Sequence, residues 1–149
     1  MSFADVGSTS GWLIPTWWLR NRGINPKEFF VYSDGATHPA NEVAVASGHV
    51  DCATDFDRNR TAMIELGKLE PKATEVIWQS DPLPNDAIAV RKGFDADLAK
   101  RIQQILVEIS ESEAKSVLPN HYTGFVSATH ASYKMIEDAG IFVGRIKKK

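Results

Sequence analysis

The sequence predicts an α/β fold with a mainly parallel sheet, and three observations support this. Short apolar runs that suit strands alternate with longer segments whose apolar residues recur at helical spacing. Glycine follows three of the predicted helices, at Gly23, Gly48 and Gly67, as is common at helix C-termini. The segments between strand and helix are rich in Ser, Thr, Asp and His. In a parallel α/β sheet, such connections form the edge where ligands bind.

The expected elements follow one another from the N-terminus. In the first half, apolar runs predict strands at 3–6, 29–32 and 50–53, with a turn at 33–35. Helical spacing and capping residues predict helices at 10–22, 39–47 and 57–66. In the second half we expect strands at 75–79 and 87–90, joined by a Pro-rich segment at 80–86. Three further helices are expected at 95–109, 112–118 and 132–143.

Length and composition limit the kinds of function that the chain can have. The 149 residues, 43% of them apolar, correspond to one domain or two small lobes. The formal net charge of −2 provides no basic surface for nucleic acid. The single Cys52 excludes an internal disulfide and is too little for a zinc or iron–sulfur site. These residues contain no apolar stretch of membrane-spanning length and no signal-peptide pattern. An anion bound here must therefore be held by local dipoles.

The segment Gly-Ser-Thr-Ser-Gly at 7–11 is the most informative part of the chain. It stands between the first strand and a Trp-rich helix, where the first backbone N–H groups have no partner and the helix dipole is positive. A small anion can accept those donors together with the hydroxyl groups of Ser8, Thr9 and Ser10. The alternative is simple N-capping, which the local pattern alone favours.

Four further polar residues lie in three loops that we expect at or near the same edge. His38 directly precedes a predicted helix, and Asp55 and Arg58 follow the third strand. Asp86 lies in the Pro-rich segment at 80–86. Each has an ordinary alternative: His38 as a surface residue at a helix start, Asp55 as a cap beside a solvated Arg58, and Asp86 as a turn residue.

A catalytic function is not favoured. The sequence has no nucleophile elbow, no Walker loop and no pair of histidines at metal-ligand spacing. His38, Ser8 and Asp55 or Asp57 have the composition of a hydrolytic triad. Two more hydroxyl residues beside Ser8, however, suit multidentate binding better than one activated oxygen. We therefore expect a binding protein with no metal and no cofactor. The alternative is a small hydrolase with His38 as its base.

Several segments resemble the phosphonate-type periplasmic solute-binding proteins of ABC transporters. They are Phe3-Ala4-Asp5 with Ser-Thr-Ser-Gly-Trp-Leu-Ile-Pro at 8–15, Asp-Gly-Ala-Thr-His at 34–38 and Gly-His-Val-Asp at 48–51. The match continues at 55–58, 83–88 and 122–126, so it runs from Phe3 to about Gly144. The resemblance implies a type II periplasmic-binding-protein-like fold, in which two α/β lobes joined by a hinge hold the ligand in a cleft.

The resemblance also implies a division of the chain. Residues 3–79 correspond to the second ligand-binding lobe, 80–86 to the hinge, and 87–149 to the C-terminal part of the first lobe, whose helices return to it. The rest of that lobe is absent, so the chain looks like a C-terminal fragment. The apolar faces of helices 95–109 and 132–143 would then lack their usual cover. We therefore expect a homodimer or a complex with the complementary fragment.

Carried over by position, the resemblance places Ser8, Thr9 and Ser10 on the ligand oxygens. His38 becomes a donor from a neighbouring helix start, and Asp86 an acceptor for a protonated ligand oxygen on the hinge side. Three second-tier residues surround these: Gly11, Asp55 and Arg58, of which the last two are expected to position the Ser/Thr turn.

The ligand implied is a small phosphorus oxyanion, because the chain is most similar to the branch that takes up phosphite and hypophosphite. Phosphonate binders of amine-bearing ligands carry an acid where Arg58 stands, which argues against an aminoalkylphosphonate. The expected function is that of a periplasmic binding protein that delivers phosphite, hypophosphite or a phosphonate to a membrane permease. A fragment that folds but binds nothing is the remaining alternative.

Overall fold

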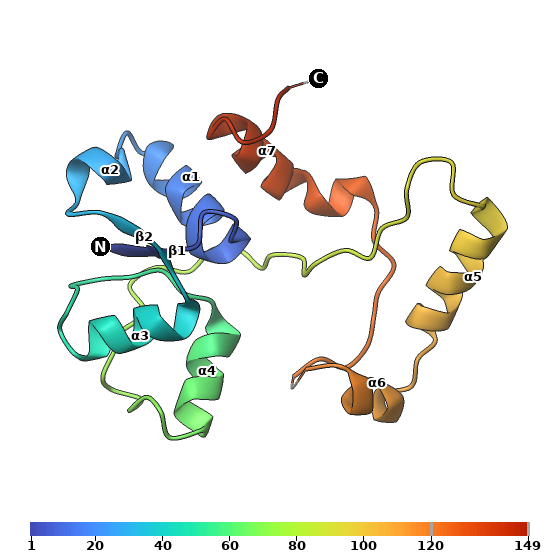
Figure 1. Ribbon diagram of the computed structural model, residues 1–149, viewed down its shortest axis with the longest axis horizontal. Coiled ribbons are helices and arrows are strands. Elements are labelled where there is room, and N and C mark those ends of the chain that lie inside the picture. The colour runs from blue at the N-terminus through green and yellow to red at the C-terminus, as the bar shows by residue number, and fades with distance from the viewer. Residues whose placement is uncertain (120, 149) are drawn as a thin grey trace. The chain divides into compact units, whose positions relative to one another are not determined.

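The computed structural model describes residues 1–119 and 121–148. The chain divides into two compact units (Figure 1). The first comprises Met1–Leu83 with Lys134–Lys149, and the second comprises Pro84–Tyr133. The boundary at Leu83 falls within the predicted hinge at 80–86, while the C-terminal segment from Lys134 groups with the first unit. The assignment of 3–79 and 87–149 to the lobes of a larger protein stays a prediction.

A small parallel sheet organises the first unit. Strand β1 (Ser2–Ala4) pairs in parallel with β2 (Ser33–Ala36), and Ser2 also forms a parallel bridge with Ala53. The Met1 carbonyl accepts from the N–H of Ser33, whereas the N–H and carbonyl of Ser2 face Cys52 and Thr54. Successive backbone groups of a strand point in opposite directions, so β1 lies between its two partners. The α/β fold is thereby confirmed.

Helices follow each of these segments, as the sequence predicts. A π-helical turn, η1 (Thr9–Leu13), leads into α1 (Ile14–Arg20), with Pro15 in the first turn of α1. The short α2 (Pro26–Phe29) follows. Helix α3 (His38–Ala46) begins after Thr37, whose hydroxyl accepts from the N–H of Ala40, and α4 (Asp57–Glu65) follows the bridge at Ala53. The predicted helices at 10–22, 39–47 and 57–66 are confirmed to within a few residues.

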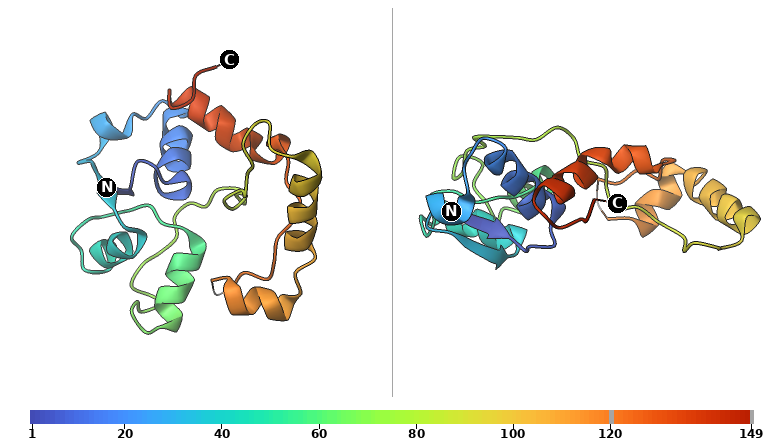
Figure 2. Two further views of the ribbon diagram at one scale, coloured as in Figure 1. Left: turned by 45° about the vertical axis from the view of Figure 1, so that its right-hand side comes forward. Right: turned by 90° about the horizontal axis from the view of Figure 1, so that it is seen from above.

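The apolar core of this unit is built around Phe3, Trp12 and Leu19. Helix α7 (Lys134–Phe142) packs against η1 and α1, as both views of Figure 2 show. Val143, just beyond α7, packs against the same core. The C-terminal segment thus covers the helix that follows the Ser/Thr turn. None of the described helices is both long enough and apolar enough to cross a membrane.

Buried polar side chains join the strand ends to the first helix. Asn41 is 1% exposed; its Oδ1 accepts from the Ser2 hydroxyl at 2.7 Å and its Nδ2 donates to the Thr54 carbonyl at 2.9 Å. The Thr54 hydroxyl donates to the Gly11 carbonyl at 2.5 Å and accepts from the N–H of Ala4 at 3.2 Å. Because these groups satisfy one another, the start of η1 is fixed relative to the sheet.

The second unit is helical, and few of its described residues are buried. It contains α5 (Ala96–Val107), α6 (Glu111–Val117) and a 3₁₀ turn, η2 (His130–Tyr133). Asp95 caps α5 by accepting from the N–H of Leu98 at 2.7 Å. No residue of α5 is buried. The predicted helices at 95–109 and 112–118 are confirmed, and the helix expected at 132–143 is present as η2 followed by α7.

The predicted strands are less accurate than the helices. The strand expected at 29–32 is wrong, because Asn25 and Pro26 start α2, and the strand begins at Ser33, where a turn was expected. In the segment 50–53, where a strand is expected, Ala53 forms an isolated β-bridge with Ser2. The strands expected at 75–79 and 87–90 do not form in the described residues. A strand needs a paired neighbour, and without one the apolar side chains there stay exposed, including Ile77 at 82% and Ile88 at 63%.

Candidate functional site

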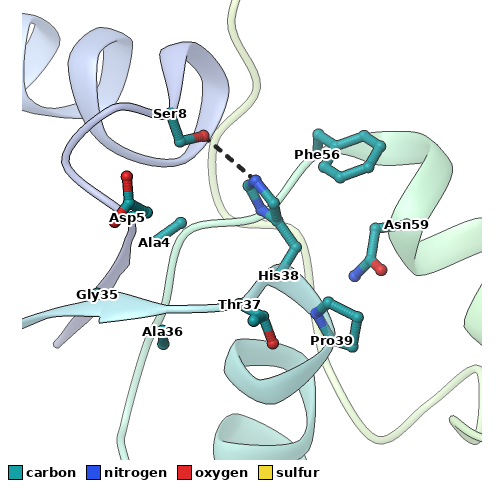
Figure 3. A pocket seen from close by; sticks show the side chains of 10 residues that line it. All are labelled: Ala4, Asp5, Ser8, Gly35, Ala36, Thr37, His38, Pro39, Phe56 and Asn59. Atoms are coloured by element: carbon teal, nitrogen blue, oxygen red, sulfur yellow. Dashed lines mark hydrogen bonds between the residues drawn. The ribbon is translucent and has the colours of Figure 1, made fainter.

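A pocket of about 610 Å³ opens where the ends of the three parallel segments meet (Figure 3). The residues that line it come from β1 and the turn after it, from β2 and the start of α3, and from the start of α4: Ala4, Asp5, Ser8, Gly35, Ala36, Thr37, His38, Pro39, Phe56 and Asn59. The pocket therefore occupies the edge of the sheet at which the sequence predicts ligand binding.

The Ser/Thr turn lies at the start of the continuous helix η1–α1. Ser8 is its N-cap, and the Ser8 hydroxyl accepts from the N–H of Gly11 at 3.0 Å. The capping interpretation therefore applies to Ser8. Thr9 and Ser10 are half-buried, and among the described residues no group accepts from their backbone N–H groups. These two donors and the hydroxyls beside them are available to a ligand.

His38 is the first residue of α3, and it faces the Ser/Thr turn. Its Nε2 lies 3.2 Å from the Ser8 hydroxyl oxygen, as the dashed line in Figure 3 shows. The ring of Phe56 meets the imidazole edge to face, with 4.7 Å between the ring centres. A neutral ring with its proton on Nδ1 accepts from Ser8, whereas a doubly protonated ring donates toward it. The fold thus joins His38 and Ser8 across 30 residues of sequence.

Asp55 lies behind His38. Its Oδ1 is 3.0 Å from His38 Nδ1, which is ion-pair distance, although the pair is not aligned as a hydrogen bond. The His38 side chain is only 19% exposed and the Asp55 side chain only 13%. Asn59 holds the other carboxylate oxygen by donating from Nδ2 to Oδ2 at 2.8 Å. Asp55 therefore contacts His38, rather than the Ser/Thr turn that it was expected to position.

Glu42 extends this network into the interior, and the sequence analysis did not identify it. The residue is 8% exposed. Burial raises the pKa of its carboxyl, and the neighbouring Asp55 carboxyl raises it further. The Thr74 hydroxyl donates to Glu42 Oε2 at 3.1 Å, and this bond lowers the pKa of Glu42. Glu42 stands four residues after His38, one helical turn along α3. That spacing is the signal that could have found it.

Gly11 permits the close approach of the elements around the turn. A β-carbon at this position would lie 2.4 Å from the Ala4 β-carbon and 2.5 Å from His38 Cε1. Both distances are too short for nonbonded carbon atoms. Gly11 was predicted as a second-tier ligand residue, and the structure gives it a packing role beside His38 as well.

Of the predicted site residues, Ser8 and His38 line the pocket. The others are not among its lining residues: Thr9, Ser10, Gly11, Asp55, Arg58 and Asp86. Arg58 lies in the first turn of α4, half-buried, with its N–H donating to Asp57 Oδ1 at 2.9 Å. Asp86 is exposed and belongs to the second unit. The structure thus brings Ser8, His38 and Asp55 together. In the described part of the chain, no group of three His, Cys, Asp or Glu side chains is arranged to hold a metal ion.

Comparison with known proteins identifies the family. Residues 1–133 match the family described as ABC transporter, phosphonate, periplasmic substrate-binding protein. The chain belongs to this family. A similar protein is the phosphonates-binding periplasmic protein of Escherichia coli strain K12, 30% identical over 115 residues, which cover 76% of this chain and 34% of that protein.

A second relative is the phosphate-import protein PhnD of Mycolicibacterium smegmatis, 25% identical over 153 aligned positions that cover 88% of this chain and 47% of that protein. The chain therefore spans half or less of the length of these curated relatives. Both are named as binding or import proteins, and the family is one of substrate-binding proteins of transporters. The expectation that the chain is not an enzyme is confirmed on that ground. The capping bond on Ser8 agrees with it, because the hydroxyl is engaged in holding a helix start.

Proposed function

We propose that the chain is part of the substrate-binding component of an ABC importer and binds a small phosphorus oxyanion, phosphite above all, without changing it chemically. Hypophosphite and phosphonates are further ligands of the same class. Family membership supports the transport role, and the names of the relatives support a phosphorus-containing anion. The partner in this role is the membrane permease, and the compartment is the periplasm.

The observation that carries the proposal is the free donor set at the start of η1. Thr9 and Ser10 offer backbone N–H groups for which the described residues provide no acceptor, and each has a hydroxyl beside it. The twelve residues of η1 and α1 direct the positive end of their dipole toward the same point. A tetrahedral oxyanion accepts several such donors at once, which suits a chain whose net charge is −2.

His38 adds a donor from a second helix start. When the ring is protonated on both nitrogens, its positive charge lies at ion-pair distance from Asp55, and Nε2 donates toward the turn at Ser8. A positive ring at this point attracts an anion held by Thr9 and Ser10. Asp55 in turn limits how the ring can rotate, since it lies 3.0 Å from Nδ1. We assign Asp55 as a positioning residue.

Asp86 and Arg58 bear on the choice of ligand. A carboxylate that accepts a hydrogen bond from P–OH repels an oxyanion that has lost all its protons, so Asp86 favours a ligand that still carries a proton. The cation of Arg58 is unfavourable for an amine-bearing phosphonate. These two roles rest on the family resemblance, and they act in the complete protein, where both lobes face the ligand.

Calorimetric titration of the chain with phosphite, hypophosphite, methylphosphonate and phosphate, at constant ionic strength, tests the proposal. We expect phosphite to bind most tightly. Ser10→Ala removes a donor without touching the cap and should weaken phosphite binding about tenfold, the effect of one charge-assisted hydrogen bond. The matched control is Ser47→Ala, at the other end of α3, where the hydroxyl donates to the Val43 carbonyl at 2.7 Å. A folded chain that binds none of the four anions, or binds them equally well after Ser10→Ala, would contradict the proposal.

A further inference from the structure

The first unit holds a second pocket, which shares no lining residue with the site described above. Its volume is about 260 Å³. Its walls come from η1, α1, α2, the residue before β2 and the segment after α7: Trp12, Thr16, Arg20, Asn25, Pro26, Lys27, Tyr32 and Arg145. The lining residues include three cations and no acid. A pocket of this composition favours a negatively charged occupant.

The three cations are Arg20, Lys27 and Arg145. In the part of the chain that the structure describes, none of them pairs with a carboxylate. Two are held in place by aromatic rings instead. The guanidinium of Arg145 lies 4.7 Å from the centre of the Trp12 ring, and the ammonium of Lys27 lies 5.3 Å from the centre of the Tyr32 ring. A cation over a ring face keeps its full charge and its N–H donors, so both remain available to an anion.

Two carboxylates touch lining residues, and both are engaged by neutral donors. Asp34 accepts from the Tyr32 hydroxyl at 2.7 Å, and Glu28 accepts from Asn25 Nδ2 at 2.5 Å. The Tyr32 hydroxyl also accepts from Trp12 Nε1 at 2.9 Å. Burial and Asp34 raise the pKa of Tyr32 to about 12, so this hydroxyl stays neutral at physiological pH. The aromatic wall is thus fixed by its own hydrogen bonds and adds no negative charge.

Thr16 supplies a second, independent sign of a ligand. The residue is only 6% exposed, and its hydroxyl has no hydrogen-bond partner among the described residues. A buried hydroxyl without a partner is unfavourable, and most such groups in folded proteins are satisfied. Thr16 lines the pocket on the same face of α1 as Arg20, one helical turn further along. An occupant of the pocket would lie beside both residues.

We propose that this pocket is a second anion site, which binds a small oxyanion with two or more negative charges through Arg20, Lys27 and Arg145. Two guanidinium groups and an ammonium suit oxygens that carry most of the ligand's charge, since a guanidinium offers paired N–H donors to two oxygens at once. The site is independent of the proposed phosphite site, because the two have no residue in common.

The test is an NMR titration of the ¹⁵N-labelled chain with sodium sulfate, with sodium chloride adjusted to keep the ionic strength constant. The indole N–H of Trp12, assigned by means of Trp12→Phe, reports on this pocket. The backbone N–H groups of Thr9 and Ser10 report on the other site in the same spectra. We expect the Trp12 signal to shift and saturate. Arg20→Gln and Arg145→Gln should each weaken this binding roughly tenfold, the effect of one charge-assisted hydrogen bond.

Arg22→Gln is the matched control, since it removes the same charge two residues from Arg20. Arg22 lies over the Trp18 ring, 4.0 Å from its centre, and outside the pocket. It should change the sulfate affinity less than twofold. Arg145→Lys, which keeps the charge over Trp12, should retain more affinity than Arg145→Gln. A Trp12 signal that never saturates, or equal weakening by Arg20→Gln and Arg22→Gln, would overturn the proposal. Neither outcome depends on whether Thr9 and Ser10 respond to phosphite.

Discussion

At the scale of single residues, Gly11 shows how little space surrounds the Ser/Thr turn. The β-carbon of Gly11→Ala would lie 2.4 Å from Ala4 and 2.5 Å from the His38 ring, so β1 or the ring must move. We expect a loss of about 1–3 kcal/mol in the free energy of unfolding, as is typical of overpacking. Denaturant unfolding measures this loss. Gly7→Ala serves as control, because the nearest atom there is the flexible carboxylate of Asp5; an equal loss in both variants would contradict the prediction.

Asp55→Asn tests the contact with His38. The substitution keeps the shape of the side chain but removes the negative charge 3.0 Å from Nδ1, so the doubly protonated ring loses its partner. We expect phosphite binding, measured by calorimetry near pH 7, to weaken about tenfold. Asp57→Asn, an exposed acid in the first turn of α4, should leave the affinity nearly unchanged. Tighter binding in Asp55→Asn would mean that Asp55 acts on the anion mainly by repulsion.

Glu42 predicts a dependence of stability on pH. Burial and Asp55 raise the pKa of this carboxyl above its ordinary value of 4.5. Between that value and the raised one, the folded chain binds more protons than the unfolded chain, so the contribution of Glu42 to stability falls as the pH rises. In denaturant unfolding, Glu42→Gln should therefore gain stability relative to wild type as the pH rises above 4.5. The exposed Glu70→Gln should follow wild type, and a constant difference between Glu42→Gln and wild type would argue against the raised pKa.

At the scale of elements, the helices were predictable because their signals are local. Thr37 with Pro39, Asp95, and Ser110 with Glu113 each mark a helix start within four residues of sequence. The sheet was not predictable in the same way. Apolar residues at 75–79 and 87–90 have strand-like composition, but a strand forms only where another strand pairs with it. The partners of β1 lie about 30 and 50 residues away, at Ser33 and Ala53.

The same distinction explains what was found at the site. Ser8, His38 and Asp55 were predicted to share an edge because each follows a strand in a βα pattern, and the structure brings them together. Glu42 was missed because it lies within a helix and carries no turn signal, although it stands one turn after His38. The second pocket was missed because Arg145 reaches Trp12 through the packing of α7, which no short-range pattern encodes.

The capping box of α6 gives a prediction for this element. The Ser110 hydroxyl donates to the Glu113 carboxylate at 2.6 Å, and the Ser110 N–H donates to it at 3.0 Å. These two bonds lower the pKa of Glu113. Ser110→Ala removes the hydroxyl and keeps the N–H, so the pKa of Glu113 should rise part of the way to its ordinary value, and the helicity of α6 should fall. NMR titration of the Glu113 side chain measures the pKa and the α-carbon shifts of α6 measure the helicity, with Ser116→Ala as control. An unchanged Glu113 pKa in Ser110→Ala would mean that the N–H alone is responsible.

At the scale of the whole molecule, exposed apolar side chains predict association. Leu98 is 48% exposed and Ile105 is 63% exposed on α5. Apolar stripes of this kind are uncommon on monomers. We expect the chain to associate with itself, so the mass from light scattering should rise with concentration. Leu98→Lys combined with Ile105→Lys should abolish the rise, whereas Lys100→Glu on the same helix should not. A constant monomer mass at high concentration would contradict this expectation.

The central position of β1 also has a consequence for the order of folding during synthesis. This strand is made before its partners at 33–36 and 52–54, which follow it in the chain with helices between them. Phe3 and Trp12 stay without their final cover until α7 is translated, because Val143 completes the cluster around them. These two side chains therefore stay partly uncovered between the synthesis of β1 and that of α7, and this is the interval in which a chaperone would have to shield them.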